Sequence, residues 1–88
     1  MDIEQFKEGF SELVQICLDI PSVTLQNATL AIDEEMATLQ KEDASEALTL
    51  LAELLVHVND LDQEEADEYQ DVLLEINERA DELRSEFI

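Results

Sequence analysis

Carboxylates at helical spacing near the C-terminal end are the residues whose types and positions could form a site. Asp67, Asp71, Glu75, Glu78 and Glu82 follow one another at steps of four or three residues. On a helix, side chains at such steps are neighbours about 5–6 Å apart on one face. We call these five residues the carboxylate ladder. They predict a helix with a continuous row of negative charge along its outward face.

The ladder suits electrostatic binding of a basic surface better than it suits helix stability. Neighbouring like charges cost a helix a few tenths of a kcal/mol per pair, and only Arg79 and Arg84 lie nearby, on the flanks of the ladder. Regular negative charge is also the main feature of nucleic acids, since double-stranded DNA carries about one charge per 1.7 Å of axis. The ladder therefore predicts a phosphate mimic that occupies the groove of a DNA- or RNA-binding protein.

The candidate binding residues extend beyond the ladder to its immediate neighbours. Leu74 interrupts the acidic face, and we interpret it either as an apolar contact at the centre of a binding patch or as a single exposed leucine, which needs no explanation. With the neighbouring acids included, the candidate set is Asp67, Glu68, Asp71, Leu74, Glu75, Glu78, Asp81 and Glu82.

The net charge of the chain points to the same class of partner. Twenty-four Asp and Glu residues against four Lys and Arg give a net charge of -20 on 88 residues. Hydrophobic residues make up 45% of the chain, which is too many for an acidic disordered tail. A folded domain with this charge repels anionic lipid and nucleic acid. We therefore expect a basic protein partner, without direct binding to nucleic acid or to a membrane.

The elements that would position these residues are all predicted to be helices. One Gly and one Pro provide few turns for a sheet, and apolar residues recur at steps of three and four in four segments, at about residues 2–18, 22–40, 43–59 and 62–87. Asp43 and Asp62, each with Glu three residues later, predict the starts of the last two helices. Short connections favour one all-α domain over residues 1–88, a small antiparallel bundle of four helices.

The sequence leaves two features of this arrangement undetermined: the number of helices in the bundle and the position of the long last helix. If residues 22–40 are partly irregular, a bundle of three helices is the fallback. The last helix is predicted to continue unbroken for about 26 residues, roughly 39 Å at 1.5 Å per residue. It would then project beyond the bundle or meet a second copy of the chain, and a homodimer is accordingly a further expectation.

The residues that enzymes use for catalysis are scarce and scattered in this chain. His57 is the only histidine, no Cys/His cluster exists, and no glycine-rich phosphate loop is present. Cys17 falls on the apolar stripe of the first helix, where we expect a buried apolar side chain rather than a nucleophile. The sequence thus predicts a protein that is not an enzyme, with no catalytic residues, metal or cofactor.

The expected location is the cytoplasm. A lone cysteine excludes an intrachain disulfide and favours a reducing compartment. The N-terminal residues are acidic and lack the apolar run of a signal peptide, and no apolar stretch approaches the about 18 residues of a membrane span.

In size, charge and helicity the chain is similar to small acidic proteins of phages and mobile elements that block host defence or DNA-processing proteins. The predicted function is therefore an inhibitor or antidote that neutralises a basic nucleic-acid-binding protein. Two alternatives stay open. One is a chaperone-like or structural adaptor that binds through apolar helix faces as a homodimer. The other is a salt-adapted domain whose charge supplies solubility alone.

Overall fold

The computed structural model describes residues 1–87, which form helices and short connections without a strand. The helices are α1 (Ile3–Leu18), α2 (Val23–Ala37), α3 (Ala44–Asn59), α4 (Gln63–Glu68) and α5 (Gln70–Phe87). The predicted all-α class is confirmed, and the segment at 22–40 is helical over most of its length. The predicted number of four helices differs from the five that the described residues form, because the last segment is divided.

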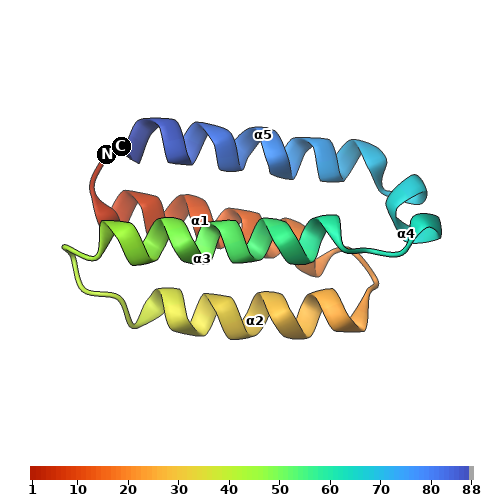
Figure 1. Ribbon diagram of the computed structural model, residues 1–88, viewed down its shortest axis with the longest axis horizontal. Coiled ribbons are helices and arrows are strands. Elements are labelled where there is room, and N and C mark those ends of the chain that lie inside the picture. The colour runs from red at the N-terminus through yellow and green to blue at the C-terminus, as the bar shows by residue number, and fades with distance from the viewer. Residues whose placement is uncertain (88) are drawn as a thin grey trace.

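The four longer helices lie side by side along the 39 Å length of the molecule, each antiparallel to the next along the chain (Figure 1). α1 and α3 lie between α5 on one edge and α2 on the opposite edge (Figure 1). α2 packs against α1 and α3, and so does α5. The outward faces of α2 and α5 therefore point to opposite sides of the molecule.

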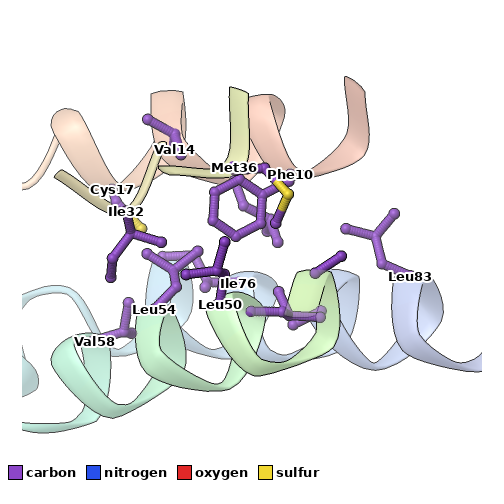
Figure 2. Close-up of a cluster of buried hydrophobic side chains, with 14 of the residues drawn as sticks. Phe10, Val14, Cys17, Ile32, Met36, Leu50, Leu54, Val58, Ile76 and Leu83 are labelled. Atoms are coloured by element: carbon purple, nitrogen blue, oxygen red, sulfur yellow. The ribbon is translucent and has the colours of Figure 1, made fainter. Parts of the chain in front are cut away.

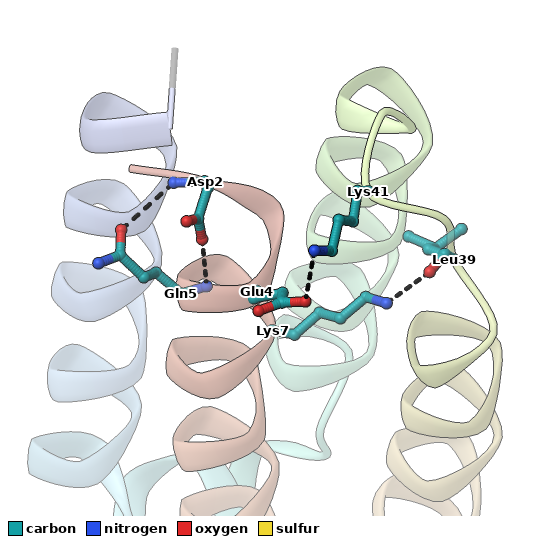
Figure 3. Close-up of polar contacts among 6 residues, drawn as sticks. All are labelled: Asp2, Glu4, Gln5, Lys7, Leu39 and Lys41. Atoms are coloured by element: carbon teal, nitrogen blue, oxygen red, sulfur yellow. Dashed lines mark hydrogen bonds and ion pairs between the residues drawn. The ribbon is translucent and has the colours of Figure 1, made fainter.

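Local hydrogen bonds explain where most helices begin. Asp2 accepts a bond from the Gln5 backbone N–H at 2.9 Å, and the Gln5 side chain accepts one from the Asp2 N–H, which completes a capping box (Figure 3). The Ser22 hydroxyl caps α2, and Asp62 caps α4 as predicted. Asp43 is the N-cap residue of α3, as predicted, but the expected capping hydrogen bond of its side chain is absent. Its ψ of 53° is not the extended value that lets a cap side chain reach back to the helix.

The predicted unbroken helix over 62–87 is also wrong, because the chain bends at Tyr69. This residue has φ −109° and ψ 24°, and α4 turns away from the axis of α5 at the end of the bundle (Figure 1). Tyr69 and Leu61 pack against the core from there. A straight extension would have carried these apolar side chains into solvent, so their burial favours the bend.

The core is a single cluster to which α1, α2, α3 and α5 all contribute. The side chains labelled in Figure 2 converge between the helices, and Phe6, Phe10 and Leu54 are fully buried. Along α1, the residues at steps of three and four are all buried: Ile3, Phe6, Phe10, Leu13 and Cys17. In α2, Thr29 is fully buried, whereas its neighbour Ala28 is only partly buried.

Cys17 is confirmed as a buried side chain of the core. Burial raises the pKa of its thiol to about 11, against a smaller lowering by the nearby Thr29 hydroxyl. That hydroxyl is buried and makes no regular hydrogen bond within the described residues, so its contact with the thiol is weak. The thiol stays neutral at physiological pH and acts as a small apolar group.

Gly9 allows α1 to approach α5 closely. A Cβ atom at this position would lie 2.3 Å from Cδ2 of Leu83, which is too close for any real contact. We expect Gly9→Ala to destabilise the protein by about 1 kcal/mol, as overpacking outweighs the better helix propensity of alanine. In a Leu83→Ala background the same change should instead stabilise by up to about 1 kcal/mol. Urea unfolding of the four chains measures both effects, and equal effects in the two backgrounds would contradict the close contact.

Candidate binding surface on α4 and α5

The structure places all eight candidate binding residues on the surface, but on two helices rather than one. Asp67 and Glu68 lie on α4, and the other six lie on α5. All eight are exposed. Exposure leaves their carboxylates hydrated and available to a partner, which is the first requirement of the predicted site.

The bend at Tyr69 divides the carboxylate ladder. Asp71, Glu75, Glu78 and Glu82 form its continuous part on α5, which we call the α5 row. Asp67 lies before the bend, so it does not extend this row along the same axis (Figure 1). The α5 row covers twelve residues, from Asp71 to Glu82, and its eleven steps of about 1.5 Å correspond to about 16 Å of helix.

Arginines partly neutralise two of the candidate residues. Arg79 bonds Glu75 at 3.1 Å and also Glu12 on α1 at 3.4 Å. Arg84 pairs with Asp81 one turn earlier on α5. These ion pairs are exposed, so each contributes at most about 1 kcal/mol. They nevertheless lower the local negative potential around Glu75 and Asp81.

The two lysines of the chain are engaged elsewhere in the molecule. Lys41 pairs with Glu4 at 3.3 Å, and Lys7 donates a hydrogen bond to the backbone carbonyl of Leu39 (Figure 3). Within residues 1–87, Asp71, Glu78 and Glu82 therefore have no ion-pair partner. These three side chains carry the strongest uncompensated charge of the α5 row.

Leu74 lies among these uncompensated charges. Its side chain is 60% exposed, and Asp71 three residues before it and Glu78 four residues after it share its face of α5. The position fits an apolar contact surrounded by carboxylates, and a lone exposed leucine has the same appearance. The function of this residue remains a prediction.

The structure adds acidic residues from outside the predicted set. A groove of about 330 Å³ between α1 and α5 is lined by Gly9, Glu12, Arg79, Glu82, Leu83 and Glu86. Glu12 is far from the ladder in sequence and joins it only because α1 and α5 are neighbours. Glu86 lies four residues after Glu82, and the regular spacing could have identified it.

The described residues hold no group of three or more His, Cys, Asp and Glu side chains arranged to bind a metal ion. His57 is exposed and lines a separate pocket of about 300 Å³ with Val23, Asp60 and Glu65, among other residues. Across residues 1–87, none of the helices has the length and apolar composition needed to cross a membrane.

Comparisons of the chain with protein-family models, with curated proteins and with solved structures found no match.

Proposed function

We propose that this protein is a phosphate mimic that binds a basic DNA- or RNA-binding protein and blocks its nucleic-acid groove. The observation that carries the proposal is the α5 row, an exposed line of carboxylates of which three have no ion-pair partner within residues 1–87. A basic groove selected to hold phosphates would gain charge-assisted hydrogen bonds from these oxygens.

The density of charge on α5 supports the comparison with a nucleic acid strand. The α5 row and Asp81 place five carboxylates on about 16 Å of helix, or about one for every 3–4 Å. One strand of DNA carries a phosphate about every 3.4 Å of axis. A basic groove that spaces its Lys and Arg side chains for phosphates therefore meets charges at a similar density.

The exposed apolar side chains support this proposal over an adaptor that binds by hydrophobic contact. On α3 and α5 the large exposed apolar residues lie singly, Val56 on α3 and Leu74 on α5. An adaptor would need an exposed apolar face on α3. Most of that face is instead buried in the core, since Leu50, Leu51 and Leu54 are buried. A broad apolar docking face on α3 is thus missing from the described residues.

The test is capture of proteins from the source cells on the immobilised chain, with elution by rising salt. A parallel column carries a variant with Asp71, Glu78 and Glu82 changed to asparagine or glutamine, which keeps the side-chain shapes. We expect the native column alone to retain a basic nucleic-acid-binding protein, released by salt and displaced by added DNA or RNA, since screening weakens such contacts.

Two results would contradict the proposal. One is retention of the same proteins on both columns. The other is retention that persists at about 1 M salt, where the Debye length falls to about 3 Å and exposed charges no longer attract one another over distance. In the latter case hydrophobic contact would carry the binding and the adaptor would replace the mimic.

A further inference from the structure

The outward face of α2 differs from the remainder of this acidic surface. Residues 20–32 contain no Asp, Glu, Lys or Arg, although 32% of the chain is charged. Within this stretch lies most of α2, whose first turn carries no acidic residue. The first ten residues of α2 are therefore uncharged, and its three acidic residues, Asp33, Glu34 and Glu35, lie together toward its C-terminal end.

A second helical stripe runs along the outward face of α2. Val23, Asn27, Leu30, Glu34 and Ala37 follow at steps of four, three, four and three residues, and all five are exposed. Val23 is 70% exposed and Leu30 is 47% exposed. This spacing is the one by which two helices pack along each other, and the core already has its own stripe on α2 in Leu25, Thr29, Ile32 and Met36.

We propose that a second copy of the chain binds this face, with α2 packed antiparallel against α2 of its partner about a twofold axis at Leu30. A twofold interface must complement itself. With the axis at Leu30, position 23 faces position 37 of the other copy, so a large Val meets a small Ala. Asn27 then lies opposite Glu34 with an offset of one residue, about 1.5 Å along the axis. At that offset the side-chain amide N–H of Asn27 can donate to the carboxylate, and this pair occurs twice.

The charge distribution selects this face over the others. Two copies that each carry -20 repel wherever their acidic faces approach. On the outward stripe of α2, Glu34 is the one ionised side chain, and Asp33 and Glu35 lie beside it. The antiparallel arrangement sets this acidic end of each α2 against the uncharged end of the other, so carboxylates of the two helices do not meet. The opposite edge of the molecule, α5, presents its row of carboxylates and cannot pair with itself without repulsion (Figure 1).

The size of the face sets the strength of the dimer. α2 has 15 residues, or about 22 Å of helix. One helix face of that length buries much less than the about 800 Å² per partner of a standard stable interface. The dimer is therefore weak, and added salt strengthens it, because screening reduces the repulsion between the two acidic bodies. This is the opposite of the salt dependence of the proposed phosphate mimicry.

Sedimentation velocity over a concentration series, at low and at high NaCl, tests the proposal with the whole chain. We expect a dimer fraction that rises with concentration and with salt. Leu30→Glu places two carboxylates against each other at the axis and should abolish the dimer. Leu74→Glu is the matched control on α5 and should leave the dimer fraction unchanged. Circular dichroism checks that both variants keep their helices, since both positions are exposed.

Cysteine cross-linking supplies a second readout that does not depend on dimer affinity. In Leu30→Cys the two thiols meet at the axis, so mild oxidation should yield a disulfide-linked dimer. Leu74→Cys should yield little, and the native Cys17 does not compete because it is buried. A chain that stays monomeric at high salt, or a Leu30→Glu variant that still dimerises, would overturn the proposal. Neither result would contradict the proposed phosphate mimicry, because the α5 row takes no part in this interface.

Discussion

Replacing Asp71, Glu78 and Glu82 together with lysine is expected to abolish binding to the basic partner while the protein stays folded. Each reversal changes the charge by two units, so the net charge moves only from -20 to -14. The loss should therefore come from the local contacts. If each carboxylate contributes about 1 kcal/mol or more through a charge-assisted hydrogen bond, three reversals weaken binding at least about a hundredfold. Calorimetric titration with the purified partner measures the loss.

A matched variant separates local contact from total charge. Glu35, Glu42 and Glu53 are exposed residues on or beside α2 and α3, away from α5, and none takes part in an ion pair within residues 1–87. Changing these three to lysine alters the net charge by the same amount. We expect it to reduce the association rate slightly and to leave affinity within a fewfold of the native chain. An equal loss of binding in both variants would mean that net charge, rather than the α5 row, attracts the partner.

Phe10→Ala is expected to have the largest effect on stability. The side chain is fully buried in the centre of the core, where it packs among α1, α2, α3 and α5 (Figure 2). Removing a buried phenylalanine costs about 3–5 kcal/mol, since the transfer free energy is lost and a cavity remains. A domain of this length has a total stability of roughly 4–13 kcal/mol, estimated at 0.05–0.15 kcal/mol per residue. The variant should consequently lose from about a quarter to all of the stability of the native chain.

Urea unfolding followed by circular dichroism measures this free energy of unfolding. The matched control is Leu74→Ala, which also shortens a large apolar side chain but at a position that is 60% exposed. We expect that control to change stability by less than about 0.5 kcal/mol. A loss below about 1 kcal/mol for Phe10→Ala would show that the core repacks around the gap.

The salt response separates the two proposed interactions. Binding of a basic partner to α5 should weaken as salt rises, whereas association of two copies through α2 should strengthen. The two surfaces lie on opposite edges of the molecule (Figure 1), so a dimer formed through α2 would present both α5 rows outward. One protein could then engage a partner at each end.

Much of the fold could be predicted from residue patterns because helices are local structures. Ile3, Phe6 and Phe10 follow the apolar steps of three and four expected for residues 2–18, and all three are buried in α1, since side chains at these steps share one face. The same periodicity placed Glu78 and Glu82 on the surface. The predicted helix start at Asp43 is confirmed, but its side chain makes no capping hydrogen bond, because capping also depends on backbone angles that residue types alone do not determine.

By itself, the sequence determined the helical class, the core stripes and the net charge, because each follows from composition or from contacts within about one turn. Only the tertiary structure decided the bend at Tyr69, the pairing of Arg79 with Glu12, and the placement of α2 and α5 on opposite edges. These features depend on which helices become neighbours. Neighbours are selected by burial of side chains distant in sequence, and no periodic pattern within one helix records that choice.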